Sequence, residues 1–194
     1  SKLPINVGRY NFDKIRYEYY RDQTVALEAF KTGRYDFRSE NSSLVWATGY
    51  NFSAHHKGDV KTEEVRHKRP TGMQAFVFNI RRSQFKDPVI RHAMSFAFDF
   101  EWSNKNLFYG QYTRTKSFFS NSNLAAKGLP SKEELALLLP WKKLLPPGLF
   151  TKTYEPPRTD GTGNIRKNLQ TAIKLLKSAG YKIRNNKLIS PKTG

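Results

Sequence analysis

The sequence predicts an α/β fold, and three observations support this prediction. Residues 15–20 are aromatic and β-branched, which is typical of a strand. Residues 73–80 are almost wholly apolar, which is typical of a strand buried on both faces. Directly after them, apolar side chains from Ile90 to Phe98 recur at helical spacing. Strands and helices that alternate in this way pack as layers around a core.

Further elements are expected in the first third of the chain. Asp22 is a candidate N-cap for a helix over residues 24–31, and Gly33 closes that helix in the left-handed conformation. Another short helix begins at Ser42 or Ser43. Short strands are predicted on either side of it, over residues 35–38 and 60–67.

The helix that follows residues 73–80 has a clear start, because Asp87 is a candidate N-cap and Pro88 occupies the first helical position. Residues 104–108 are expected to add a second helical turn. Ser131 and Glu134 form a capping-box pattern in front of another apolar run.

The last part of the chain is predicted as a loop, a helix and a hairpin. Residues 140–163 are rich in Pro and Gly and read as a long surface loop. The helix from Ile165 to Ala179 has apolar residues at a 4-3-4-3 spacing and ends at Gly180. Residues 181–189 form a small hairpin that turns at two adjacent asparagines.

The composition limits the range of functions. The chain has 194 residues, 38% of them hydrophobic, and no cysteine, so it fits one domain with its own core, or at most two small ones, without disulfides or thiolate metal sites. No apolar run approaches the roughly 20 residues that cross a bilayer, so no stable membrane insertion is expected. The net charge of +18 attracts anions. The basic residues are spread along the chain, which favours a solvated basic surface over a nucleic-acid-binding tail.

No constellation of catalytic or metal-ligating residues is present. His55 and His56 are adjacent and His67 lies further on, a spacing that does not direct three ligands at one metal ion. No serine lies in a nucleophile motif, and no glycine-rich phosphate loop occurs. Basic residues interleave with aromatic ones at 16–21 and 109–119, a pattern that fits stacked bases or simple strand alternation. The sequence therefore predicts no enzyme, no metal and no cofactor.

One stretch carries a specific resemblance. Phe30 to Phe37 has the pattern F-x-x-G-x-x-D, and a buried run ending in Asn79 leads to Phe85-Lys86-Asp87-Pro88-Val89-Ile90-Arg91-His92-Ala93. These motifs resemble the family 5 extracellular solute-binding proteins of bacterial ABC importers. Further matches at 98–110, 117–119, 128–131 and 134–138 are similar to the branch that includes microcin C and muropeptide binders.

The resemblance implies a fold, a location and a function. The fold is one lobe of a type II periplasmic-binding-protein fold, with a small mixed sheet and flanking helices, over residues 1–194. The function is substrate binding for a peptide or muropeptide importer in the periplasm, with a signal peptide outside this chain. Its partners are the ligand, a permease and a first lobe on the same or a neighbouring chain. No nucleic-acid partner is expected; the alternative is a basic module that binds nucleic acid or an envelope polymer.

Three segments are implied as this lobe's share of the ligand cleft. They are the loop after residues 35–38, the buried run before the main helix, and the end of that helical region with its following loop. Their candidate ligand-binding residues are Glu40, Asn41, Met73, Gln74, Ala75, Val77, Phe108, Tyr109 and Arg114. The net charge and the position of Arg114 near two tyrosines predict an anionic group on the ligand.

Overall fold

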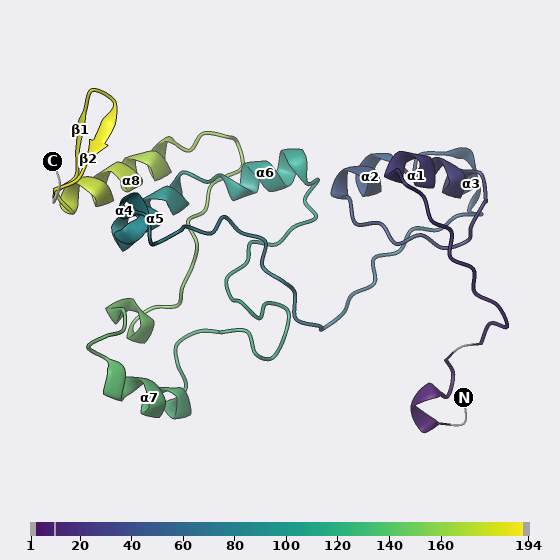
Figure 1. Ribbon diagram of the computed structural model, residues 1–194, viewed down its shortest axis with the longest axis horizontal. Coiled ribbons are helices and arrows are strands. Elements are labelled where there is room, and N and C mark those ends of the chain that lie inside the picture. The colour runs from purple at the N-terminus through teal and green to yellow at the C-terminus, as the bar shows by residue number, and fades with distance from the viewer. Residues whose placement is uncertain (1–2, 10, 192–194) are drawn as a thin grey trace. The chain divides into compact units, whose positions relative to one another are not determined.

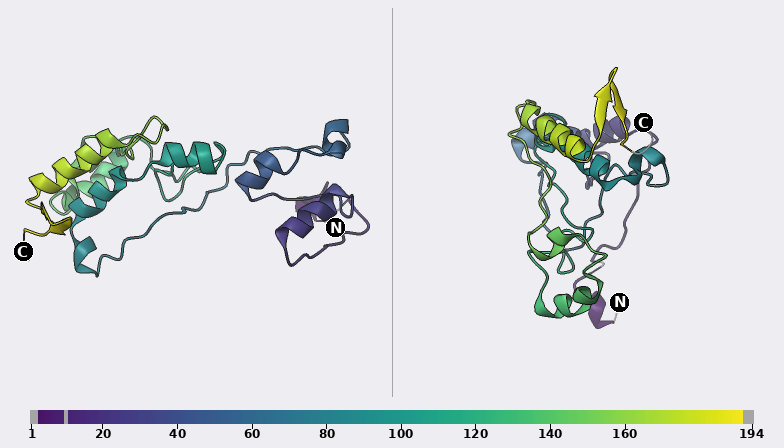
Figure 2. Two further views of the ribbon diagram at one scale, coloured as in Figure 1. Left: turned by 90° about the horizontal axis from the view of Figure 1, so that it is seen from above. Right: turned by 90° about the vertical axis from the view of Figure 1, so that its left-hand side faces the viewer.

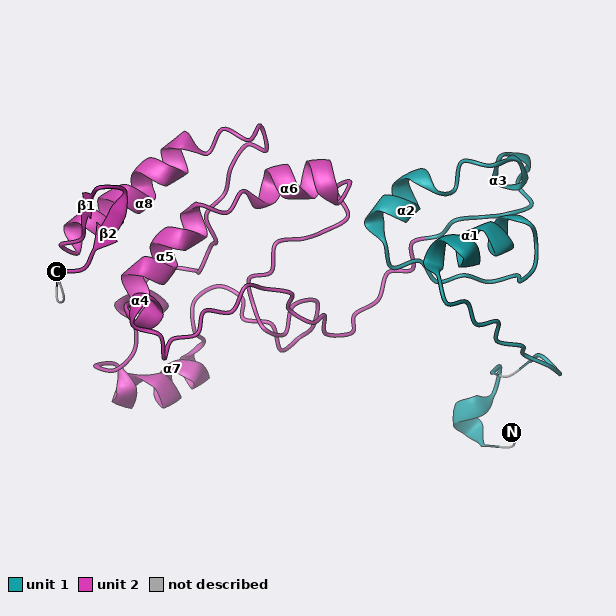
Figure 3. Ribbon diagram, turned by 45° about the horizontal axis from the view of Figure 1, so that its top comes forward, with its two compact units in different colours: residues 1–63 teal, residues 64–194 magenta. Residues whose placement is uncertain are grey.

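The computed structural model describes residues 3–9 and 11–191, which form two compact units (Figure 3). Unit 1 is Ser1–Glu63 and unit 2 is Glu64–Gly194. In the described residues, short helices and one two-stranded antiparallel sheet make up the regular structure. Both helices and strands are therefore present, as expected, but the predicted mixed sheet is not found in this part of the chain. None of the described helices has the length and apolar character needed to span a membrane.

The elements of unit 1 are η1 (Pro4–Asn6), α1 (Gln23–Lys31), α2 (Ser43–Thr48) and α3 (Ser53–Lys57). Two of these helices, α1 and α2, have the starts that the sequence predicted, whereas η1 and α3 were not predicted. The Asp22 carboxylate accepts the N–H groups of the first turn of α1, and the Ser42 hydroxyl accepts one from α2. These caps satisfy donors that have no partner within the helix. Gly33 adopts a φ of 73°, as predicted for the residue that closes α1.

The core of unit 1 is a small aromatic cluster. Leu27, Phe30 and Tyr50 are buried and pack against partly buried neighbours. The Phe30 ring lies 5.4 Å from Tyr35 and 6.3 Å from Tyr50, both within the range of favourable aromatic pairs. The Tyr35 hydroxyl donates to the carbonyl of Ala26 at 2.7 Å, which fixes the segment after α1 against the helix.

In unit 2 the main feature is a pair of packed helices, α5 (Pro88–Phe96) and α8 (Arg166–Ser178), which lie side by side in Figures 1 and 2. The buried residue of α5 is Ala93 and that of α8 is Ala172. Both side chains are small, which lets the two helices approach closely. The other elements are α4 (Ser83–Lys86), α6 (Phe100–Leu107), α7 (Lys132–Leu138), η2 (Leu139–Trp141), η3 (Pro147–Phe150), β1 (Lys182–Arg184) and β2 (Lys187–Ile189).

Several predicted boundaries in unit 2 are confirmed. The Asp87 side chain accepts the N–H of Val89 at 2.8 Å, with Pro88 in the first position of α5. The capping box of Ser131 and Glu134 is present at the start of α7. Gly180 follows the last turn of α8 with a φ of 84°. The predicted loop at 140–163 contains η3 and the end of η2, and otherwise has no regular structure.

The hairpin at the end of the chain also follows its prediction. Strands β1 and β2 pair in an antiparallel register that sets Lys182 opposite Ile189. Asn185 and Asn186 form the turn with φ values of 49° and 59°. Asparagine tolerates this left-handed region, and two such residues give the turn type whose twist matches a two-residue hairpin.

The four strands predicted upstream are wrong. Residues 15–20, 35–38, 60–67 and 73–80 contain no strand. The physical reason is that a strand requires a partner edge for its backbone N–H and C=O groups, and the described residues offer these segments none.

Candidate functional site: the α6 region of unit 2

The start of α6 is held by a cluster of polar side chains. Asp99 caps the helix by accepting the N–H of Trp102 at 3.0 Å. The hydroxyl of Thr159 donates to the same carboxylate, and the Thr159 N–H donates to Glu101 at 3.0 Å. Thr159 belongs to the long loop before α8, so these contacts join two segments far apart in the sequence.

Close backbone packing extends this junction. A Cβ added at Gly163 would lie 3.1 Å from the Trp102 ring, tighter than ordinary packing allows. Gly163 also has a φ of 85°, so the loop needs glycine there for both space and conformation.

A tight turn follows α6. Tyr109 and Gly110 both have positive φ values, 53° and 75°. The side chain of Asn104 makes two hydrogen bonds with the backbone of Tyr112, accepting its N–H at 3.0 Å and donating to its carbonyl at 2.7 Å. The Phe108 and Tyr112 rings meet edge to face with centroids 4.6 Å apart. The predicted residues Phe108 and Tyr109 are thus held in a defined conformation by Asn104 and Tyr112.

Arg114 lies just beyond this turn and packs against two aromatic rings. Its guanidinium carbon is 5.0 Å from the Phe98 centroid and 5.2 Å from the Phe100 centroid, within cation–π range. One guanidinium nitrogen, Nη1, is buried without a hydrogen-bond partner in the described part of the chain, as is Oδ2 of Asp99. No described carboxylate lies within 4.0 Å of Arg114. The charge of this side chain is therefore not neutralised within the described residues.

Glu40 lies in unit 1, within a polar network. Its side chain is only 6% exposed and forms an ion pair with Arg38 at 3.1 Å. It also accepts the Ser42 N–H at 2.9 Å and the Tyr50 hydroxyl at 3.4 Å. Both of its carboxylate oxygens are engaged in holding the segment after α1, while Asn41 is exposed.

This network shifts the pKa of two of its side chains, Tyr50 and Arg38. Burial raises the pKa of the Tyr50 hydroxyl, and the charge of Glu40 raises it further. Burial lowers the pKa of Arg38, but the hydrogen bonds with Tyr35 and Glu40 outweigh that effect and leave the pKa raised. Arg38 therefore stays charged and Tyr50 stays neutral at physiological pH.

The remaining predicted ligand residues lie in a segment of unit 2 without helix or strand. Met73 is 41% exposed and Val77 is 91% exposed, and Gln74 and Ala75 are also exposed. Phe108 and Tyr109 follow the end of α6, Arg114 packs against Phe98 and Phe100 at its start, and the four predicted residues of this segment form no enclosed site.

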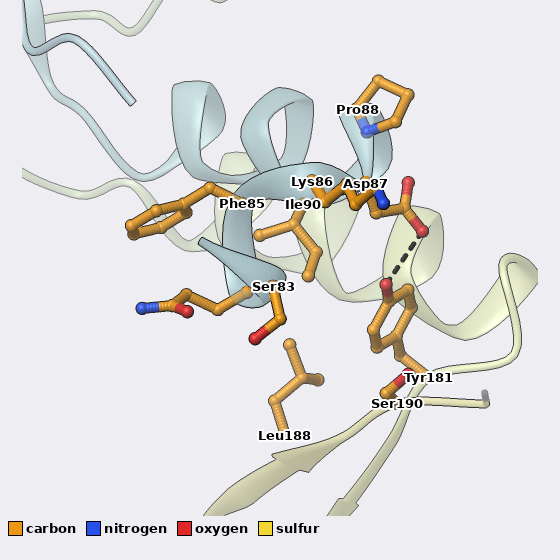
Figure 4. A pocket seen from close by; sticks show the side chains of 10 residues that line it. Ser83, Phe85, Lys86, Asp87, Pro88, Ile90, Tyr181, Leu188 and Ser190 are labelled. Carbon is orange, nitrogen blue, oxygen red and sulfur yellow. Dashed lines mark hydrogen bonds between the residues drawn. The ribbon is translucent and has the colours of Figure 1, made fainter. Parts of the chain in front are cut away.

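A separate pocket of about 660 Å³ lies between α4, the start of α5 and the terminal hairpin (Figure 4). Tyr181 points across it and its hydroxyl donates to Asp87 at 2.8 Å. Phe85, Ile90 and Leu188 give it an apolar wall. None of the predicted ligand residues lines this pocket.

The histidines do not form a metal site in the described residues. His55 and His56 sit in consecutive positions of α3, and the His55 ring nitrogen lies 3.4 Å from the Thr62 hydroxyl. No group of three His, Cys, Asp or Glu side chains with metal-binding geometry occurs in the part of the chain that the structure describes.

Comparison with known proteins places the chain. Residues 6–193 match the family model described as "Bacterial extracellular solute-binding proteins, family 5 Middle". The chain belongs to this family. Family 5 membership agrees with the motifs around Gly33 and Asp87.

Relatives in family 5 are much longer than this chain. It is 44% identical over its whole length to an uncharacterized protein YejA of Escherichia coli K12 and covers 32% of that relative. It is 46% identical over 98% of its length to a probable peptide-binding protein YejA of Agrobacterium fabrum, covering 31% of it. A peptidoglycan-binding protein YepA of the same organism is 42% identical over 96% of the chain, which covers 32% of that relative. The chain thus spans about a third of the length of these relatives.

Some residues of the α6 region were not singled out from the sequence. They are Phe98 and Phe100, which flank Arg114, and Asn104 and Thr159, which hold the turn and the start of α6. The interleaving of aromatic and basic residues at 109–119 was a partial signal. Thr159 and Asp99 are 60 residues apart in the sequence, so no local pattern predicts their contact.

Proposed function

We propose that this chain forms part of the substrate-binding subunit of a bacterial ABC importer whose ligands are peptides or muropeptides. The observation that carries the proposal is the family 5 match over residues 6–193, together with relatives named as peptide-binding and peptidoglycan-binding proteins. In this role the chain works in the periplasm, catalyses no reaction and delivers its ligand to a permease. A first lobe, on the same or a neighbouring polypeptide, completes the cleft.

Within this subunit, the α6 region supplies the ligand contacts of unit 2. Phe108 and Tyr109 offer aromatic surface on a turn that Asn104 already holds. Arg114 carries a charge that the described residues do not neutralise, and an Arg guanidinium binds a carboxylate through two parallel hydrogen bonds. Muropeptides and peptides both carry carboxylates, so they match this site. Glu40, Asn41 and residues 73–77 are proposed as lesser contributors.

The proposal is tested with a chimaera in which this chain replaces the matching third of the Escherichia coli relative. Calorimetry with oligopeptides and muropeptides measures binding by the chimaera and by the chain alone. We expect the chimaera to bind and the chain alone to bind weakly, because a one-sided site stays in contact with water. Submicromolar peptide binding by the chain alone, or no binding by the chimaera, would contradict the proposal.

A sharper experiment addresses Arg114 in the same chimaera. Arg114→Ala is expected to weaken an acidic muropeptide by about 1.5–3 kcal/mol, the range for hydrogen bonds to charged groups, and to leave a neutral peptide of equal length nearly unchanged. Arg114→Lys restores only part of the loss, because lysine lacks the planar fork. Equal effects on both ligands would assign Arg114 to the scaffold of α6.

The second candidate function is binding of an anionic polymer. It is favoured by the net charge and by the absence of any Asp or Glu after Asp160, a region with seven basic residues at positions 166–187. Binding that depends steeply on salt and is equal for DNA and acidic glycans would support this alternative.

A further inference from the structure

The guanidinium of Arg114 packs on two rings that share one neighbour in the sequence. Its central carbon lies 5.0 Å from the Phe98 centroid and 5.2 Å from the Phe100 centroid. Asp99 lies between these two phenylalanines. A shift of the backbone at Asp99 therefore moves both rings, and with them the surface that holds the guanidinium. The orientation of Arg114 thus depends on what holds Asp99.

A segment far along the chain holds Asp99. Residues 155–163, here called the strap, belong to the long loop before α8. The Thr159 hydroxyl donates to Oδ1 of Asp99 and lies 3.1 Å from Oε2 of Glu101. The Thr159 N–H donates to the same Glu101 oxygen at 3.0 Å. These contacts of one strap residue fix the first turn of α6, to which both rings are attached.

The strap is itself packed and anchored. Pro156 and Gly161 are buried on either side of Thr159. The Asn168 side chain, on α8, donates to the carbonyl of Arg158 at 3.1 Å. Packing and a further layer of hydrogen bonds are what keep a functional side chain in one geometry. Thr159 therefore reaches Asp99 from a position that α8 helps to fix.

The strap also holds the chain just after Arg114. Lys116 lies two residues further on, and its Nζ forms an ion pair with Oε2 of Glu155 at 2.6 Å. Both side chains are partly exposed, so the pair adds little to the stability of the fold. It does join two segments that are 39 residues apart in the sequence. Arg114 is thus held through its supporting rings and through the chain that follows it.

We propose that Thr159 and Glu155 are positioning residues, which keep Arg114 in the orientation that receives a ligand carboxylate and so set a preference for acidic ligands. This inference rests on the proposed function for the role of Arg114. A long side chain that is ordered before the ligand arrives loses less entropy on binding. A carboxylate that accepts two parallel hydrogen bonds also requires a fixed guanidinium plane. A neutral ligand makes no such pair, so its affinity does not depend on the strap.

Nuclear magnetic resonance of the arginine side chains tests the positioning without any ligand. In this chain, ring currents of Phe98 and Phe100 should displace the Arg114 Nε–H signal, which is assigned by its loss in Arg114→Lys. Thr159→Val keeps the shape but removes the hydroxyl, so most of the displacement should disappear, whereas Thr159→Ser should retain it. Thr153→Val is the matched control, because Thr153 is exposed in the same loop. A displacement that survives Thr159→Val, or that is equally lost in Thr153→Val, would overturn the proposal.

The ion pair gives a second measurement at a surface position that does not disturb the start of α6. Glu155→Gln and Lys116→Gln should each remove part of the displacement of the Arg114 signal. The two substitutions together should do no more than either alone, because they remove the same interaction. An unchanged signal in both single variants would exclude Glu155 as a positioning residue.

Calorimetry on the Escherichia coli chimaera connects the strap with ligand choice. Thr159→Val is expected to weaken an acidic muropeptide by roughly two- to tenfold, the cost of ordering one long side chain on binding, and to leave a neutral peptide of equal length unchanged. In the Arg114→Ala background, Thr159→Val should change neither affinity, because its effect passes through Arg114.

Two results of this calorimetry would contradict the proposal. One is equal weakening of both ligands by Thr159→Val, and the other is an undiminished effect in the Arg114→Ala background. Either would show that Thr159 acts only on the fold of unit 2. If the chimaera binds no peptide while the arginine signal responds as expected, the proposed function fails and the positioning of Arg114 by the strap stands.

Discussion

Helix α5 and residues 72–78, which precede it with α4 in between, are both rich in apolar side chains, yet only the helix is formed. Each helical N–H finds its acceptor four residues earlier, and Asp87 satisfies a donor at the start. The strand-like segment needs acceptors from distant chain, and closing that distance costs conformational entropy. The difference shows which structure short-range sequence encodes and which depends on long-range partners.

The largest effect on this comparison is expected from the α5–α8 contact, because packing rather than capping holds α5. Ala93 is only 3% exposed, so Ala93→Leu overfills the contact and destabilises unit 2 by about 1–3 kcal/mol. Urea unfolding, monitored by hydrogen exchange of the α8 amides, measures this loss of stability. Met94→Leu on the exposed side of α5 is the matched control and should be nearly neutral. If both variants unfold at the same urea concentration, packing against α8 does not stabilise α5, and its stability comes from the helix and its cap alone.

A medium effect is expected from Asp87→Ala, which removes the cap and the acceptor of the Tyr181 hydroxyl. The loss is about 1–2 kcal/mol, from one N-cap and one side-chain hydrogen bond. Thermal unfolding measures it, and peptide affinity of the chimaera should change little. A large loss of affinity at an unchanged melting temperature would move Asp87 from the scaffold to the ligand site.

The smallest effect concerns the Tyr181 hydroxyl and pH. Its hydrogen bond to Asp87 raises the pKa of Tyr181 above the ordinary value of about 10, and burial and the Asp87 charge act in the same direction. The bond therefore stabilises unit 2 fully below about pH 10 and is lost as pH rises through the raised pKa. Melting temperatures from about pH 8 to 11.5 should fall more steeply for the native chain than for Tyr181→Phe. Parallel curves would show that this hydrogen bond does not contribute to the stability of unit 2.

The difference between local and long-range contacts also explains what the sequence could predict. The caps at Asp22, Ser42, Asp87 and Ser131 were correct because each bond is local. The Asn185–Asn186 turn was correct because its conformation depends on those two residues. The upstream strands were wrong because apolar alternation reports a preference for pairing without supplying the pair.

The candidate site shows the same limit. Phe108, Tyr109 and Arg114 are close in sequence, but Phe108 and Tyr109 follow the end of α6 whereas Arg114 packs at its start, against Phe98 and Phe100. The rings that flank Arg114 could not be assigned from pattern, since apolar residues at 98 and 100 equally fit a helix start. The Thr159 contact with Asp99 and Glu101 comes from a loop with no periodicity. Ligand roles for Glu40, Asn41 and residues 73–77 remain predictions.

The hydrogen bond between Tyr181 and Asp87 joins residues that are 94 positions apart. A ribosome adds about 5–20 residues per second, so roughly 5–20 seconds pass between the synthesis of the two partners. During that interval α5 has emerged with its cap but without α8, and its apolar side is open to other proteins. The contact of α5 with α8 and the bond between Asp87 and Tyr181 can therefore form only after the last turn of α8 and the start of the hairpin have been made.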